Sequence, residues 1–346
     1  MRQTDIAIVD GDHAGSIRHP QAPILFDRLS GRLSGASMVE RLAVLAMQAG
    51  AKATDRFHHR GLSLGCRLLR PVLGERDILV QFSEDAVFGF PFGDAYWSFV
   101  LDRGFTYEIE IDRLLRGIAD VDYTFVDCGA NFGLWSVLAT SKPFGSHPAI
   151  AIEASAANTT RLAANARLNG DRFQVMHRAI GAASGGTAWL SGRKHEAITT
   201  IGAEAGRGEA VPIIALDSLL DDGMLTPARP LVVKLDVEGV EIDAMRGARR
   251  LFAADTAIIY EEHGSDRAHT VSRFVLNETP YRAFVLNPAT DCFERLTDLA
   301  TLDRIKVSRF HGYNAFAATS PFWEARLMSL GSHQRIATHR ARMNNR

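Results

Sequence analysis

The stretch Tyr123-Thr-Phe-Val-Asp-Cys-Gly-Ala-Asn-Phe-Gly133 decides the fold of this chain of 346 residues. An apolar run ends at Asp127, a loop with Gly129 and Gly133 follows at once, and residues 134–140 have the pattern of a helix. A strand that ends in a glycine loop and leads into a helix is how an open parallel sheet builds a nucleotide site. Glycine suits such a loop because it lets the backbone approach a ligand closely. The stretch therefore predicts an α/β fold with a cofactor at this loop.

The loop does not carry the dinucleotide fingerprint, which has glycines at its first, third and sixth positions. This chain has Gly129, Asn131 and Leu134 at those positions, and Gly133 falls one place early. A pyrophosphate bound at the helix N-terminus is therefore disfavoured, which argues against a nicotinamide-dependent oxidoreductase. Glycine loops after strands also occur as plain turns, so the loop alone leaves both interpretations open.

A second apolar segment, Ala149-Ile-Ala-Ile-Glu153, reads as a buried strand with an acid at its C-terminal end. Glu153 follows Asp127 by 26 residues, near the spacing of about 20 residues expected for an acid that binds ribose hydroxyls. A carboxylate can accept hydrogen bonds from both hydroxyls of a diol. The alternative is a favourable charge at the N-terminus of a helix that begins near Ala156. Because strand, loop, helix, strand and acid occur in order, we favour ribose binding.

A third segment, Leu231-Val-Val-Lys-Leu-Asp-Val-Glu-Gly239, is another buried strand that ends in the charged residues Lys234, Asp236 and Glu238. Charges at the C-terminal end of a parallel strand face the crevice where ligands bind. Paired carboxylates there can act as a general base or hold a hard cation. An unpaired acid is costly to bury, which favours a functional role for Asp236. Glu241 is more simply a favourable charge at the start of the next helix.

Together these blocks resemble the FkbM family of S-adenosylmethionine-dependent methyltransferases. The resemblance rests on Phe125 to Gly133, on Ala151 to Glu153 with the asparagines of Leu162 to Asn169, and on Lys234 to Gly239. Family members read much like "DvGAN.G", "a.EP" followed by "N...N", and "KiDvEG.E". The resemblance spans about residues 107–319 and leaves residues 1–100 uncovered. Cys128 stands where a small aliphatic residue is usual, and Ala154 stands where proline is common.

The resemblance implies a Rossmann-like class I methyltransferase sheet, mostly parallel with an antiparallel edge, and S-adenosylmethionine as cofactor. The loop residues would surround the methionine part, Glu153 would hold the ribose, and the segment Arg178 to Gly181 would pass the adenine. The implied cofactor-binding residues are Asp127, Gly129, Ala130, Asn131, Gly133, Glu153, Ala154, Asn158, Ala179, Ile180 and Asp236.

A hydroxyl acceptor on a sugar or other small molecule is a poor nucleophile and needs a base as its proton leaves. The candidate bases are Asp236, Glu238, Glu261, Glu262 and His263, the last three from the strand-like segment 257–264. Our expected catalytic residues are Asp236, Glu238, Glu261 and Lys234. No metal-ligand motif is present, so no metal residue is assigned. Asp236 and Glu261, at neighbouring strand ends, could nevertheless share a divalent ion.

The composition fits an enzyme and excludes some partners. The formal net charge of −1 gives no field that favours nucleic acid or an anionic membrane. Cys66, Cys128 and Cys292 are scattered and show no disulfide or metal spacing, which fits a reducing compartment. The sequence shows no signal peptide or membrane-spanning run, so we expect a cytoplasmic protein. A non-catalytic cofactor-binding protein remains the rival, and homo-oligomer formation stays open.

The expected organisation has three parts: an N-terminal extension over 1–104, a methyltransferase domain over 105–322, and a C-terminal helix and polar tail over 323–346. Within the extension, 1–35 reads as loop, 36–51 as a helix, and 77–82, 86–90 and 97–101 as short antiparallel strands. Residues 107–118 read as a helix. Residues 281–286 and 313–318 read as the antiparallel edge strands. The polar segments 193–200 and 206–208 could close over substrate or be plain surface.

Overall fold

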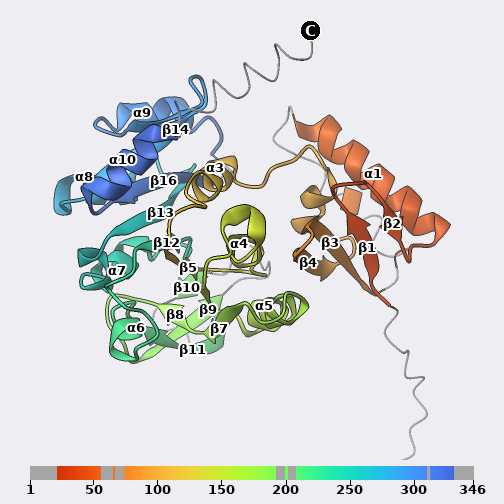
Figure 1. Ribbon diagram of the computed structural model, residues 1–346, viewed down its shortest axis with the longest axis horizontal. Helices are drawn as coiled ribbons and strands as arrows, with labels where there is room; N and C mark the ends of the chain where they lie inside the picture. Colours follow the sequence, from red (N-terminus) through yellow and green to blue (C-terminus); the bar gives the residue numbers. More distant parts are fainter. Residues whose placement is uncertain are drawn as a thin grey trace, which may run out of the picture.

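The computed structural model describes residues 22–55, 65, 66, 73, 75–191, 199–201, 208–309 and 312–330. An eight-stranded sheet forms its centre (Figure 1). In spatial order the strands are β15 (Cys292–Arg295), β14 (Arg282–Asn287), β16 (Gly312–Ala318), β13 (Thr256–His263), β12 (Leu231–Leu235), β5 (Thr124–Cys128), β6 (Ala149–Glu153) and β7 (Phe173–His177). The run from β13 to β7 is parallel, and β14, β15 and β16 pair antiparallel. The expected fold class, including its antiparallel edge, is confirmed.

Side-chain alternation along the central strands divides the interior into two cores. Phe125 of β5 and Val232 of β12 face one core, whereas Val126 and Val233 face the other. The first core is covered by α3 (Ile109–Gly117), α4 (Leu134–Ala139), α5 (Ala156–Leu168) and α10 (Pro321–Ser329); the second by α6 (Ser218–Asp221), α7 (Glu241–Arg246), α8 (Thr270–Glu278) and α9 (Ala300–Ile305). Strands buried on both faces explain why these segments read as unbroken apolar runs.

The N-terminal region forms a second, four-stranded sheet. Its strands, in the order β2 (Leu33–Ser34), β1 (Ile24–Asp27), β3 (Asp77–Ser83) and β4 (Ala86–Pro91), pack with α1 (Met38–Asp55). The predicted hairpin of β3 and β4 and the predicted helix are present. The expectation of loop is wrong for residues 24–27 and 33–34, because β1 pairs parallel with β3 and antiparallel with β2, and residues 1–21 lie outside the described part.

The predicted strand over 97–101 is also wrong, since Trp97–Leu101 forms the 3-10 helix η2. Asp94 explains this difference, because its Oδ1 accepts hydrogen bonds from the backbone N–H groups of Tyr96 at 2.9 Å and Trp97 at 2.7 Å. An aspartate that captures the amides that follow it starts a helical turn and competes with an extended strand.

Asn165 of α5 and Asn169 at its C-cap fasten this N-terminal sheet to the central domain, and α5 lies beside β4 in Figure 1. The amide of Asn165 accepts from Gly89 N at 2.7 Å and donates to Gly89 O at 3.1 Å and to Phe132 O at 2.8 Å. Asn169 makes the matching pair with Val87, at 2.9 Å from N and 2.7 Å to O. The two side chains thus satisfy the free edge of β4 as a neighbouring strand would.

The chain between β7 and β12 forms a small sheet of β10 (Thr199–Ile201), β9 (Thr187–Ser191), β11 (Glu209–Ile214) and β8 (Ala179–Ile180). Most of the expected substrate-closing segments, 193–198 and 206–207, lie outside the described residues, as does the predicted tail from 331 onward. The remaining short helices are η3 (Lys142–Phe144) and η4 (Leu251–Ala253). Within the described part, no helix is both long and apolar enough to cross a membrane.

Candidate active site

The loop after β5 has the backbone that its glycines suggest. Gly129, Asn131 and Gly133 have φ angles of 75°, 52° and 86°, all in the left-handed region. A Cβ placed on Gly129 would lie 1.7 Å from the carbonyl oxygen of Asp236. Only glycine therefore allows this loop to pass so close to the end of β12. The close approach brings the first and third sequence blocks together.

Glu153 closes the other side of this loop. Its Oε2 accepts from Asn131 N at 2.8 Å and its Oε1 from Ser155 N at 2.8 Å. Burial raises the pKa of Glu153 to about 7, although these backbone hydrogen bonds and Asn158 act in the opposite direction. Ser155 is the N-cap of α5, and its side chain accepts from Asn158 N. Glu153 thus contacts both the glycine loop and the start of α5, so ribose binding and a favourable charge at the helix N-terminus both stay predictions.

The segment expected near the adenine lies next to Glu153. Arg178 N donates to Glu153 O at 3.0 Å, and Ala179 and Ile180 follow as the buried strand β8. Ala154 packs against the small core that includes Ala179. The structure thus brings these predicted cofactor residues to one edge, and their contact with adenine stays a prediction.

Lys234 is the cationic centre of the site. Its Nζ donates to Asp236 Oδ2 at 2.8 Å, and its side chain is only 4% exposed. Burial lowers the pKa of Lys234, but the carboxylates of Asp236, Glu108 and Asp127 outweigh burial and hold it above its usual value. Lys234 therefore stays an ammonium ion at neutral pH. It balances negative charge and is not available as a base.

Asp127 lies beside Lys234 in the β5–β12 register and is 1% exposed. Its Oδ2 accepts from the hydroxyl of Ser136 at 2.7 Å. Its Oδ1 is buried and has no hydrogen-bond partner within the described residues. Burial raises the pKa of Asp127, against the charge of Lys234. A buried acceptor without a donor is costly, so this oxygen suits a hydrogen-bond donor of a ligand.

Glu108 is the functional candidate that sequence reasoning missed. It precedes α3 with a left-handed φ of 43°, an uncommon conformation for a residue with a side chain. Its oxygens accept from Trp135 Nε1 at 2.5 Å and Asn314 Nδ2 at 3.1 Å. Burial raises its pKa to about 7, with Asp236 adding to the shift and Lys234 opposing it. The sequence gives little signal, because Glu108 stands alone before a helix.

Three further acids and a histidine come to the same strand ends. Burial, followed by the charges of Asp236 and Glu241, raises the pKa of Glu238 to about 7. Burial and Asp236 hold the pKa of Glu261 well above its ordinary value. Burial also acts on Asp236, but Lys234 and the hydrogen bond from it lower the pKa of Asp236. His263 Nε2 lies 3.8 Å from Glu261 Oε2.

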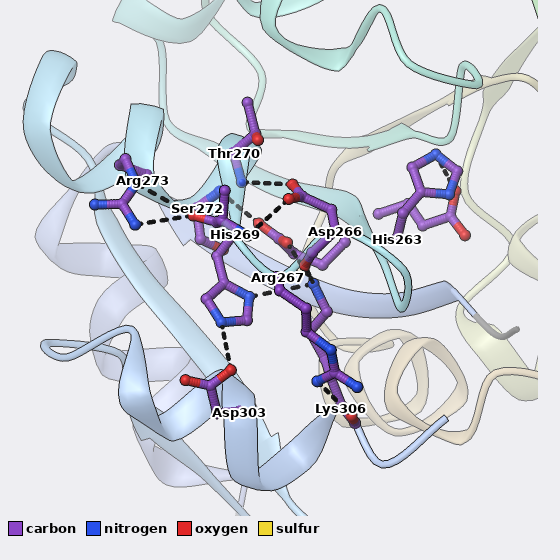
Figure 2. A network of polar contacts seen from close by, with 12 residues as sticks. His263, Asp266, Arg267, His269, Thr270, Ser272, Arg273, Asp303 and Lys306 are labelled. Atoms are coloured by element: carbon purple, nitrogen blue, oxygen red, sulfur yellow. Dashed lines mark hydrogen bonds and ion pairs between the residues drawn. The ribbon is translucent and has the colours of Figure 1, made fainter. Parts of the chain in front are cut away.

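Glu262 is not part of this group, although it was a candidate base. Successive strand residues point to opposite faces, so Glu262 turns away from Glu261 and His263. It is 1% exposed and accepts from Lys306 Nζ at 3.1 Å and from Ser272 N at 2.5 Å. Figure 2 shows this buried network around Lys306 and His269, with His263 lying apart from it. Glu262 has a structural role.

Comparison with known families identifies the domain that holds this site. Residues 127–282 match the family model described as the methyltransferase FkbM domain. This part of the chain is a methyltransferase FkbM domain. The match begins at Asp127, at the end of β5, and reaches the first residue of β14. The predicted family is confirmed.

Solved structures similar to this chain include three methyltransferases at low identity. Methyltransferase FkbM from Methylobacillus flagellatus is 17% identical, with 57% of this chain and 43% of that chain covered and a TM-score of 0.38. Precorrin-6y C5,15-methyltransferase from Geobacter metallireducens is 13% identical, with 61% and 87% covered and a TM-score of 0.33. An O-methyltransferase from Bacillus cereus in complex with SAH is 15% identical, with 60% and 78% covered and a TM-score of 0.35. The chain thus spans less than half of the first of these proteins. No curated protein matches the chain.

The match over residues 127–282 supports the expected S-adenosylmethionine-dependent methyltransferase, and the activity of the whole chain is taken up below as a proposal. S-adenosylmethionine is therefore the expected cofactor. The match favours the enzyme over both alternatives that the sequence left open, the nicotinamide-dependent oxidoreductase and the non-catalytic binding protein. Glu108 lies before the matched segment and Asn314 after it, so the FkbM match alone does not delimit the site. The individual site roles stay predictions.

Proposed function

We propose that this enzyme transfers a methyl group from S-adenosylmethionine to a hydroxyl of a small-molecule or glycan acceptor. One observation carries the proposal: the ionised pair of Lys234 and Asp236 lies directly beside the glycine loop, where Gly129 packs against Asp236 O. The glycine loop that would hold the cofactor and the candidate base Asp236 therefore lie in the same crevice. Catalytic groups must lie within reach of the reacting atoms, and this arrangement supports the proposal.

The residues of the loop fit the cofactor. The unpartnered Oδ1 of Asp127 suits the amino group of the methionine part, and the Glu153 carboxylate suits the ribose diol. Glu153 already accepts two backbone hydrogen bonds, but a carboxylate has about four acceptor sites. When bound, S-adenosylmethionine supplies an activated methyl group, so that the protein has no leaving group to activate.

The remaining chemistry is proton removal from the acceptor. As the bond between acceptor oxygen and methyl carbon forms and the carbon–sulfur bond breaks, the hydroxyl proton must move to a base. Asp236 Oδ2 is held by Lys234, and Asp236 also has a side-chain hydrogen bond with Glu261, so a remaining lone pair of this carboxylate would accept that proton. A lowered pKa does not disqualify Asp236, since an oxygen that gains a methyl group becomes strongly acidic. Lys234 orients Asp236 and balances its charge, whereas Glu108 acts on Lys234 through its charge.

The test is an Asp236→Ala variant with Asp236→Asn beside it. We expect both to lose turnover by at least about 100-fold, the lower range for removing a general base. Methyl transfer from tritiated S-adenosylmethionine to a panel of sugars and other hydroxylated acceptors gives the rate. Calorimetric titration with S-adenosylhomocysteine checks that the cofactor site is intact.

Asp243→Ala is the matched control, because Asp243 is an exposed acid paired only with Arg246 on the surface of α7. It should keep full turnover. If either Asp236 variant methylates an acceptor at the unmutated rate, Asp236 is not the base. If the unmutated protein binds neither S-adenosylmethionine nor S-adenosylhomocysteine, the whole proposal fails.

A further inference from the structure

We propose that Glu241, Glu261 and His263 form a site for a divalent transition-metal cation at the acceptor side of the crevice. One ligand atom from each residue lies within 4.8 Å of the other two. Two of the residues end β13, and the third begins α7. The set differs from the sequence expectation, which joined Asp236 to Glu261; Asp236 is instead held by Lys234.

The orientation of Glu261 points to a ligand. Its Oε2 is buried and has no hydrogen-bond partner within the described residues. At 3.8 Å, His263 Nε2 faces this oxygen but is too distant for a hydrogen bond. The other oxygen is packed against Gly312, where an added Cβ would lie 1.6 Å from Oε1. The carboxyl is thus confined between β16 and the crevice, with one buried acceptor atom that a cation would satisfy.

The charge around Glu261 also favours a cation. The negative charges of Asp236, Glu238 and Glu108 act on Glu261, which also has a side-chain hydrogen bond with Asp236. Lys234 is already bonded to Asp236. Carboxylates gathered in a partly buried crevice repel one another unless protons or a cation offset their charge. A divalent ion would supply that charge in the place where the ligand atoms converge.

The three ligands are held before any ion arrives. Glu241 Oε1 accepts from Val237 N at 3.3 Å and Gly239 N at 3.1 Å, which fixes its carboxylate over the loop after β12. The main chain of His263 is held by Asp266 N, which donates to His263 O at 3.0 Å. Such supporting bonds orient metal ligands and tune their affinity.

The buried network in Figure 2 anchors the loop that follows His263. Lys306 Nζ donates to Asp266 O at 2.6 Å and to Glu262 Oε2 at 3.1 Å, and His269 Nδ1 lies 3.2 Å from the same ammonium. Asp266 in turn accepts from the backbone of Ala268 and Thr270. This rigid loop holds His263 beside Glu261 on the crevice face of β13.

Two carboxylates and one imidazole select the class of ion. Carboxylates suit manganese and magnesium, whereas imidazole suits zinc and other first-row transition metals. Three protein ligands leave coordination positions open, as in catalytic metal sites. Bound there, a hydroxyl would lose its proton more readily. This catalytic role rests on the proposed methyl transfer, but binding of the ion does not.

The test is titration of the full chain with manganese chloride, followed by the electron paramagnetic resonance signal of free Mn²⁺ and by calorimetry. We expect one saturable site in the unmutated protein. Glu241→Gln and His263→Ala should each weaken it by roughly 10–100-fold or more. Glu278→Gln, the same substitution at an exposed position of α8, should leave the affinity unchanged.

Each variant is also titrated with S-adenosylhomocysteine and melted without metal, which shows that it is folded. Glu241→Gln could disturb the loop that it caps, so His263→Ala, whose side chain is 40% exposed, is the deciding variant. Absence of saturable binding by Mn²⁺, Zn²⁺ and Mg²⁺ would overturn the proposal, and so would unchanged Mn²⁺ affinity in His263→Ala. Retained binding of S-adenosylhomocysteine in that case would leave the proposed methyl transfer standing.

Discussion

At the scale of single residues, Glu153 couples the cofactor site to pH. Its folded-state pKa is raised to about 7, and burial is the main cause. Hydroxyl groups of a bound ribose would donate to the ionised carboxylate and so lower this pKa in the complex. Binding should therefore release a proton between the two pKa values, and affinity should rise with pH in that window.

We expect the affinity for S-adenosylhomocysteine to be constant above about pH 7.5 and to fall as pH drops through 7, by up to about tenfold per pH unit. Calorimetry at several pH values, in buffers of different ionisation enthalpy, measures both the affinity and the released proton. Glu153→Gln should remove the pH dependence near 7. A profile that is the same in both proteins would show that Glu153 does not bind the ribose.

At the scale of elements, the contact between α5 and β4 depends on asparagine side chains that hydrogen-bond the backbone of β4 as a neighbouring strand would. Asn165→Ala would leave three buried backbone groups without partners, on Gly89 and Phe132. Each orphaned group costs about 1–3 kcal/mol, so we expect the free energy of unfolding to fall by at least about 3 kcal/mol. Urea denaturation measures this loss.

Asn277→Ala provides the matched control for Asn165→Ala, since Asn277 is exposed on α8. It should change the free energy of unfolding by less than about 0.5 kcal/mol. Because Phe132 belongs to the glycine loop, Asn165→Ala should also weaken binding of S-adenosylhomocysteine. Equal stability of the two variants would show that the Asn165 hydrogen bonds are replaced by water.

Sequence patterns predict the strands and turns whose conformation is set by neighbouring residues. The buried runs of β5, β6 and β12 and the turns after them are strong signals, because apolar length and glycine placement are local properties. The antiparallel strands β14 and β16 follow for the same reason. Trp97 to Leu101 was misread because its aromatic and apolar residues resemble a strand, while the decisive Asp94 stands three residues earlier.

The candidate site was predictable only in part, for a related reason. Lys234 and Asp236 were predictable because they lie at the C-terminal end of a buried strand, where the order of apolar and charged residues indicates a site. Glu108 and Asn314 are 206 residues apart and meet only through the fold, so no spacing rule connects them. Glu261 and Glu262 are indistinguishable by type, and only the face of β13 assigns one to the crevice and the other to Lys306.

At the scale of the whole molecule, the N-terminal extension and the methyltransferase domain share one core. A single buried cluster runs from Ile24 and Phe26 through Phe88 and Trp97 to Phe125 of the central sheet. The expected boundary at residue 104 therefore falls within continuous packing, and residues 105–346 alone would expose a large apolar face.

We expect a fragment of residues 105–346 to be insoluble or to unfold without cooperativity, and the full chain to melt in one calorimetric transition. Circular dichroism and binding of S-adenosylhomocysteine test the fragment. A soluble fragment that binds this ligand as tightly as the full chain would show that the boundary at 104 separates independent domains.

The alternation along β13 also limits how this chain can change in length. Glu261, Glu262 and His263 are consecutive, yet they serve opposite faces of the sheet. Deleting one residue within β13 would reverse those faces for the rest of the strand. Glu262 would then no longer reach Lys306, and Glu261 would turn away from the crevice. Substitutions there can be absorbed one at a time, but an insertion or deletion of a single codon would remove the site and the loop anchor together.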